Sequence, residues 1–202
     1  MARPIVFVFA RAPLYGTVKS RLARDIGSLE TIRFYRRTLS ETCRRLSLDP
    51  RIELRLATTP HAALHQEGLW PRRVSRIDQG RGDLGQRMIS VLKSVQCGPA
   101  IVIGSDIPDA RPGHIAEAVR LLGSSPYVLG PVHDGGYWLI GARHPSTLRK
   151  DALKGVRWST PFAMQDTRDK LGSVALLATT LTDVDDAASL KPVAARMAEE
   201  IP

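Results

Sequence analysis

The residues whose types and spacing could do chemistry fall into three segments, each placed after a strand-like stretch. The first is a cationic loop, RAPLYGTVKSR, with Arg11, Lys19 and Arg21. Gly16 permits close approach of the backbone, and the loop leads into an expected helix whose amino end favours an anion. Arginine and lysine side chains both bind phosphate oxygens. The pattern predicts a phosphate site, and a solvated basic loop is the alternative.

The second and third segments are acidic. Asp106 follows the apolar stretch AIVIG, and a second group, TDVDD, contains Asp183 and Asp185. In an extended backbone, residues two apart face the same side, so the side chains of Asp183 and Asp185 are expected to point in the same direction. Carboxylates held this way can ligate magnesium. The alternative for the last segment is a helix cap, which suits Asp186 well.

Two glycine-containing segments are less specific. HDGGY, residues 133–137, is typical of a tight turn. Alternatively, Gly135 and Gly136 leave space for a ligand, while Asp134 binds a hydroxyl or acts as a base. The segment GRGDLG, residues 80–85, has the spacing of a dinucleotide loop but does not follow the apolar first strand, so we reject an NAD site. A helix end that touches a nucleotide remains open.

The elements that must position these residues alternate between strands and helices. Amphipathic helices are expected over residues 32–46, 84–95 and 112–122, from near Ser159, and over 190–201. This alternation predicts an α/β fold with a mostly parallel sheet covered on both faces, in which ligands sit beyond the carboxyl ends of the strands. The expected strands are Pro4–Ala10, Ile52–Leu56, Val74–Ile77, Ala100–Gly104, Tyr127–Leu129, Tyr137–Ile140 and Val174–Leu177.

Composition favours one folded domain over residues 1–202. The chain is 43% hydrophobic, its two cysteines form no disulfide framework, and its five histidines form no convincing zinc site. No apolar run approaches the roughly 18 residues that a membrane span needs, and we expect a cytoplasmic protein.

The net charge of +9 is unevenly spread: residues 1–87 carry 17 Lys and Arg against 8 Asp and Glu, and the remainder carries 12 of each. A basic half suits an anionic ligand. Nucleic acid is not expected, because aromatic residues are few and no nucleic-acid-binding motif is present.

In chain order, the blocks FARAPxxGxVKSRL, GDLGQRM, GSDIPD, GPxxDGGYWLIG and DVDD resemble the nucleotide-diphospho-sugar transferase superfamily. The blocks are most similar to a bacterial and archaeal group of glycosyltransferase-like proteins, also described as radical-SAM/selenodomain-associated transferases. Relatives of this group include phospholactate guanylyltransferase and the molybdenum cofactor guanylyl- and cytidylyltransferases. The resemblance implies a glycosyltransferase A-type fold, a single three-layer α/β/α Rossmann-like sandwich with a mixed sheet.

The resemblance also implies roles for individual residues. Arg11, Gly16, Lys19 and Arg21 would hold the nucleotide phosphates, and Gly82, Asp83, Gly85 and Arg87 would line the nucleotide pocket. Asp106, joined by Asp183 or Asp185, would bind Mg²⁺ or Mn²⁺. The turn of Asp134, Gly135 and Gly136 would face the acceptor. Lys19, Asp106 and Asp134 are the catalytic candidates. The usual DVDTPED ending is DVDDAAS here.

The leading hypothesis is metal-dependent nucleotidyl transfer from a nucleoside triphosphate to a phosphorylated acceptor, with release of pyrophosphate. The main alternative is transfer of a sugar from a nucleotide-sugar to a sugar acceptor at the same site. A non-catalytic nucleotide-binding protein is a third possibility, and it would not need the carboxylates.

Overall fold

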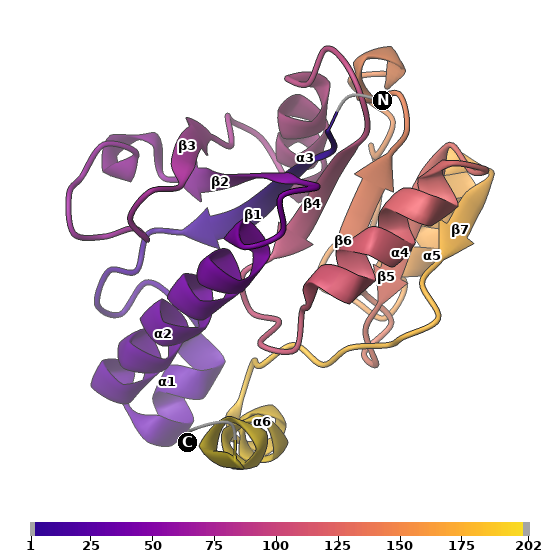
Figure 1. Ribbon diagram of the computed structural model, residues 1–202. Helices are drawn as coiled ribbons and strands as arrows, with labels where there is room; N and C mark the ends of the chain where they lie inside the picture. Colours follow the sequence, from indigo (N-terminus) through magenta and orange to yellow (C-terminus); the bar gives the residue numbers. More distant parts are fainter. Residues whose placement is uncertain (1–2, 200–202) are drawn as a thin grey trace.

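The computed structural model describes residues 3–199 of the chain. Its centre is a seven-stranded sheet of order β3-β2-β1-β4-β6-β5-β7, in which β6 alone runs antiparallel to its neighbours (Figure 1). This arrangement confirms the predicted mostly parallel, mixed sheet. The strands are β1 Ile5–Arg11, β2 Glu53–Thr59, β3 Ser75–Asp78, β4 Ala100–Gly104, β5 Tyr127–Pro131, β6 Tyr137–Ala142 and β7 Val174–Leu176.

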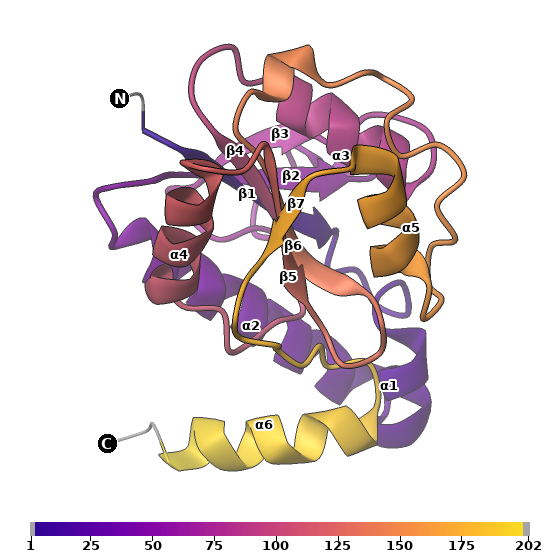
Figure 2. The same cartoon turned by 90° about the vertical axis from the view of Figure 1, so that its right-hand side faces the viewer.

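Helices cover both faces of the sheet and complete the predicted three layers. Helices α2 and α4 lie on one face, and α3 and α5 lie on the other (Figure 2). The helices of the described residues are α1 Ser20–Ile26, α2 Ser28–Ser47, α3 Leu84–Lys93, α4 Pro112–Leu122, α5 Ala163–Leu171 and α6 Ala187–Glu199. None of them is long and apolar enough to cross a membrane.

Strand β1 is buried on both faces because its side chains alternate between two cores. Val6 and Val8 belong to the core under α2 and α4, whereas Phe7 belongs to the core under α3 and α5. On its two edges β1 pairs in parallel with β2 and β4. This packing fixes the carboxyl end of β1, where the cationic loop begins, next to that of β4, where Asp106 follows.

A third, smaller core lies beside α1 and α6. It consists of the fully or nearly fully buried Leu22, Val184 and Val193, with Ile26 and Leu190 packed around them. Val184 comes from the acidic segment that precedes α6. The two helices lie side by side beyond the edge of the sheet in both views (Figures 1 and 2). This core therefore anchors the acidic segment to the body of the protein.

Two predicted boundaries differ from the structure. Helix α5 begins at Ala163 and not near Ser159, because Ser159 has a left-handed backbone (φ 58°) that cannot continue into a helix. The acidic segment does not follow a strand directly, since β7 ends at Leu176. An isolated parallel bridge between Val132 and Leu181 brings the chain back to the sheet just before the acidic segment. Ile201, expected in the last helix, lies outside the described residues.

Candidate active site

A cavity of about 670 Å³ opens at the carboxyl ends of β1 and β4. This is the edge where ligands bind in open parallel sheets. Arg11 reaches it from the end of β1, Lys19 from the loop after β1, and Asp106 from the turn after β4. The two chemically different segments predicted from the sequence thus meet in one space.

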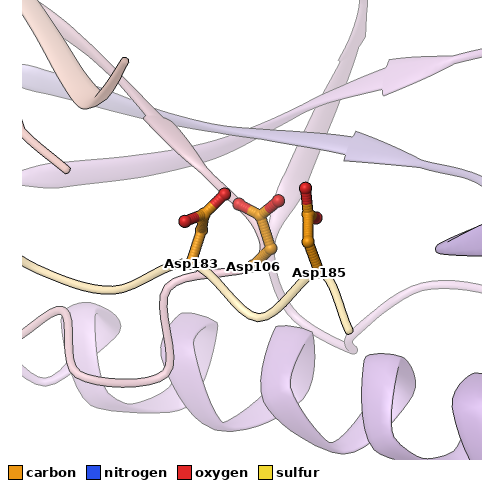
Figure 3. Close-up of side chains that lie close together, drawn as sticks. All are labelled: Asp106, Asp183 and Asp185. Carbon is orange, nitrogen blue, oxygen red and sulfur yellow. The ribbon is translucent and has the colours of Figure 1, made fainter. Parts of the chain in front are cut away.

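Three carboxylates gather on one side of the cavity. Ligand oxygens of Asp106, Asp183 and Asp185 all lie within 4.8 Å of one another, and their side chains point in the same direction (Figure 3). Val184, fully buried between the last two, turns away from the cavity, and its N–H donates to the carbonyl of Asp106 at 3.1 Å. That alternation sends both neighbouring carboxylates to the same side, as their spacing predicted.

Lys19 bridges two of these carboxylates. Its Nζ lies 2.6 Å from Asp106 Oδ2 and 2.5 Å from Asp185 Oδ1, and its side chain is 10% exposed. Burial alone would lower the pKa of Lys19, but the attraction of Asp106 and Asp185 outweighs it and raises the pKa above its ordinary value. Lys19 is therefore a fixed positive charge at the centre of the site. Arg21, 68% exposed, approaches Asp185 only to 3.9 Å.

The third carboxylate, Asp183, forms no ion pair among the described residues and is repelled by the neighbouring negative charges. Burial, followed by the charges of Asp106, Asp185 and Asp134, raises the pKa of Asp183 to about 6. The fold thus holds this carboxylate where a cation would relieve the repulsion. Carboxylate oxygens are the ligands that hard divalent cations prefer. The donor set fits magnesium or manganese, and Asp106, Asp183 and Asp185 are the residues that would hold the ion.

A tyrosine on α2 fixes the two loops relative to each other. The Tyr35 hydroxyl accepts from the Arg11 N–H at 3.1 Å and donates to the Arg11 carbonyl at 3.0 Å. It also lies 3.1 Å from Ser105 Oγ, within a buried hydrogen bond. Because Ser105 precedes Asp106, one side chain ties the start of the cationic loop to the start of the acidic one.

On the opposite side of the cavity, Arg87 is held by a neutral partner. Its Nη1 donates to Gln79 Oε1 at 2.6 Å, and the amide nitrogen of Gln79 donates to the carbonyls of Ala57 and Ala10. Burial, and next the charge of Arg11, lower the pKa of Arg87. The guanidinium groups of Arg11 and Arg87 repel each other, and the glutamine that holds Arg87 is uncharged. An anion bound between the two groups would relieve this repulsion, so the site suits an anion.

The structure brings most of the predicted site residues together. Nine of them line the cavity: Arg11, Lys19, Arg21, Arg87, Asp106, Asp134, Gly136, Asp183 and Asp185. Five others do not line it: Gly16, Gly82, Asp83, Gly85 and Gly135.

Local structure explains the positions of these five. The Asp83 carboxylate caps α3 by accepting from the Gln86 N–H at 2.8 Å, and Gly82 lies beside the Gln86 side chain. Gly85 is buried under the Trp158 ring, where an added Cβ would be 2.7 Å from it. Gly135, at φ 87°, packs against the Pro161 carbonyl, and Gly16 takes a positive φ in the turn of the cationic loop. Their contribution is to shape the walls.

Several residues that line the cavity carried no motif. Tyr35 and Met88 lie within the amphipathic helices predicted over residues 32–46 and 84–95, and Gln79 and Trp158 had drawn no prediction at all. Gln79 directly precedes the glycine-rich segment and Trp158 lies before a helix, but nothing in their local sequence indicates that they reach the site. Only the tertiary structure brings them there.

Fold and site together define an α/β protein of the nucleotide-diphospho-sugar transferase type. Residues 42–160 match the profile of a family described as "Uncharacterized protein conserved in bacteria (DUF2064)". The chain belongs to this family. No curated protein sequence matches the chain.

Solved structures confirm the predicted superfamily. A protein from Desulfovibrio desulfuricans G20, provisionally named a nucleotide-diphospho-sugar transferase, is 26% identical and superposes with a TM-score of 0.87 over 100% of this chain and 90% of its own. A cytidylyltransferase from Leptospira borgpetersenii is 12% identical, with a TM-score of 0.66 over 100% and 89%. The predicted class, a transferase, agrees with these neighbours.

A CMP:2-keto-3-deoxy-manno-octonic acid synthetase in complex with CTP is 14% identical, with a TM-score of 0.61 over 99% of this chain and 100% of its own. At this identity, and at that of the Leptospira protein, the likeness establishes the fold alone.

Replacement of Lys19 tests its place among the carboxylates. Lys19→Met leaves Asp106 and Asp185 without their partner, so we expect a loss of about 2 kcal/mol of stability, between the values for surface and buried ion pairs. Magnesium should raise the melting temperature of the variant more than that of the unaltered protein, because no ammonium competes for the oxygens. Thermal denaturation with and without MgCl₂ measures both effects. Lys150→Met, on the exposed surface, is the control, and equal magnesium responses in all three proteins would contradict this account.

The raised pKa of Asp183 predicts a pH-dependent gain of stability in Asp183→Asn. Between pH of about 4 and 6 the folded state keeps a proton that the unfolded state has lost, so this group makes stability fall as pH rises through that window. Without metal, Asp183→Asn should therefore have a higher melting temperature than the unaltered protein at pH 7.5. At pH 4 the two proteins should have the same melting temperature. Asp186→Asn is the matched control: its pKa is lowered by the backbone N–H of Ser189, and its melting temperature should not rise at pH 7.5. A rise of equal size at both pH values would rule out titration as the cause.

Proposed function

We propose that this protein is a metal-dependent nucleotidyltransferase that uses a nucleoside triphosphate and releases pyrophosphate. The observation that carries the proposal is the two-sided cavity. Cationic side chains from the loop after β1 and from α3 face three carboxylates gathered at the end of β4 and before α6. A triphosphate and a divalent cation complement these two sides, and the protein of similar fold solved with CTP supports a nucleotide ligand.

In the proposed reaction an acceptor oxygen attacks the α-phosphorus of the triphosphate. The bond from that phosphorus to the bridging oxygen of the β-phosphate breaks, and pyrophosphate leaves. Magnesium held by Asp106, Asp183 and Asp185 would offset the negative charge that builds up on the phosphates. Arg11 and Arg87 would bind phosphate oxygens through their forked donors.

Lys19 can bind groups on both sides of the proposed site, the carboxylates and the phosphates. In the free protein its ammonium group neutralises Asp106 and Asp185 at 2.6 and 2.5 Å. A cation bound at the carboxylates would free the ammonium group to bind the phosphates. Because such charges act in fixed positions, they stabilise a transition state without reorganisation at the moment of reaction.

Sugar transfer from a nucleotide-sugar is the second candidate, favoured by the name of the Desulfovibrio protein. The same cations would then hold the diphosphate, the acceptor would attack the anomeric carbon, and a nucleoside diphosphate would leave. The two reactions differ in the phosphate product.

The proposal predicts a nucleotide that binds only with a divalent cation and through Lys19. CTP or GTP with MgCl₂ should raise the melting temperature, and either alone should raise it much less. Lys19→Ala and Asp106→Asn should each abolish most of the shift, whereas Arg24→Ala, on the exposed side of α1, should retain it. Turnover should release pyrophosphate; release of a nucleoside diphosphate from a nucleotide-sugar would instead establish sugar transfer. If no triphosphate or nucleotide-sugar shifts the melting temperature, or if Lys19→Ala retains the full shift, the proposed site is wrong.

A further inference from the structure

The cavity has two walls of opposite charge. The cations that line it are Arg11, Lys19, Arg21 and Arg87, all from the first 87 residues. The carboxylates that line it are Asp106, Asp134, Asp183 and Asp185, all beyond β4. Lys19 reaches across to the acidic side, and Arg21 approaches Asp185 at 3.9 Å. The nucleotide phosphates belong on the cationic wall, so the acceptor must approach along the other one.

Among the described residues, the segments that form the acidic wall add no Lys or Arg to the lining of the cavity. Arg157 adjoins the lining residue Trp158 but is committed elsewhere. Its guanidinium pairs with Asp166 at 2.7 Å and stacks over the Phe162 ring at 4.1 Å from the ring centre. His133 is exposed and does not line the cavity. Lys19 and the proposed cation would offset Asp106, Asp183 and Asp185, whereas Asp134 makes no ion pair among the described residues, so a phosphate group entering here would be repelled by Asp134.

The lining of the cavity also contains aromatic side chains. Tyr137 and Trp138 on β6 and Trp158 in the following loop all border the cavity. Trp158 stands edge-on to Tyr137, with ring centres 6.3 Å apart, and is seated on Gly85 of α3. Its buried Nε1–H finds no acceptor among the described residues. Amphipathic rings beside carboxylates suit a ligand with hydroxyl groups on an apolar ring frame, which is the chemistry of a sugar.

We propose that the acceptor is an uncharged, sugar-like molecule that reacts through a hydroxyl group, and not a phosphate ester. From the sequence we predicted a phosphorylated acceptor for nucleotidyl transfer and a sugar acceptor for the alternative sugar transfer; the charge of Asp134 favours a sugar acceptor for nucleotidyl transfer as well. The inference rests on the proposed nucleotidyl transfer and specifies its acceptor.

The fourth carboxylate, Asp134, can accept the proton of the attacking hydroxyl group. Asp134 lies outside the three-carboxylate cluster, and its Oδ1 is oriented by the Gly136 N–H at 2.9 Å. As the hydroxyl oxygen forms its bond to the α-phosphorus and pyrophosphate leaves, the hydroxyl proton passes to the Asp134 carboxylate. A phosphate dianion used as the nucleophile would carry no proton, and this carboxylate would only repel it. A general base on the acceptor side therefore fits a hydroxyl.

The test compares two acceptor pools with the full-length protein, MgCl₂ and the triphosphate that gives the largest thermal shift. One pool contains neutral hexoses, pentoses and their methyl glycosides, and the other contains hexose and pentose phosphates. We expect pyrophosphate release with the neutral pool to exceed that with the phosphate pool at least tenfold. Equal or faster release with the phosphates, or no release above hydrolysis with either pool, overturns the inference.

Two variants separate electrostatic repulsion from a general disturbance of the site. Asp134→Asn should slow the neutral acceptor, because the base is lost, and should speed any residual reaction of the phosphates, because a negative charge is lost. Trp158→Phe should raise the KM for the neutral acceptor severalfold with a smaller change in kcat, and His133→Asn, beside Asp134 but off the cavity, should change neither. If Asp134→Asn slows both pools equally, the repulsion on which the inference depends is absent.

The thermal shift keeps this inference distinct from the proposed function. A triphosphate that binds with magnesium and reacts with sugar phosphates refutes only the neutral acceptor. The absence of any nucleotide-dependent shift refutes both.

Discussion

The ion pairs of Lys19 with Asp106 and Asp185 join parts of the chain that are 87 and 166 residues apart. One ammonium group thereby connects the loop after the first strand, the turn after the fourth and the segment before the last helix. The arrangement is held from behind as well, because Tyr35 bonds to Arg11 and Ser105 and because Val184 is buried beside α1. Without the Lys19 ammonium group, three carboxylates within 4.8 Å of one another would repel, and this repulsion would oppose the packing of Val184 that anchors the segment before α6.

Strand order converts the uneven charge along the chain into a site. The excess of Lys and Arg lies in the first 87 residues, and that half contributes β1, β2 and β3. In the sheet, β1 pairs with β4, so the first strand of the basic half lies next to the first strand of the other half. The boundary between them is where the cavity opens. A charge imbalance that could have been a solvated surface is therefore concentrated at the one edge of the sheet where parallel strands leave loops free to bind.

Much of this could be predicted from the sequence, for identifiable reasons. The apolar runs at β1 and β4 are long and continuous, so the sheet and the strand-end positions of Arg11 and Asp106 followed directly. The pairing of Asp183 with Asp185 was predicted from their spacing, although the supporting element is an isolated bridge and a buried valine and not a strand. The segment from Gly82 to Arg87 was predicted as pocket lining, yet only Leu84 and Arg87 of this segment line the cavity, and the Asp83 carboxylate instead caps α3.

What the sequence could not give depends on contacts between distant segments. Trp158 reaches the site because Gly85, 73 positions earlier, leaves room for its ring. Gln79 supports Arg87 only because the carbonyls of Ala10 and Ala57, from two other strands, accept from its amide. Neither of these contacts produces a pattern in the local sequence from which it could be predicted.

The position of Lys19 also constrains how ligands can enter. The ammonium group lies between Asp106 and Asp185, two of the three carboxylates that would hold the proposed cation. A divalent cation alone would have to displace a well-placed partner from low-dielectric surroundings, and the displaced ammonium would then lie beside the new charge without an anion of its own. A triphosphate that arrives with the cation removes that difficulty, since its oxygens receive the ammonium as the carboxylates receive the metal. Under the proposed function, the cation and the triphosphate would each neutralise a charge that the other displaces, and by reciprocity each would strengthen the binding of the other by the same factor.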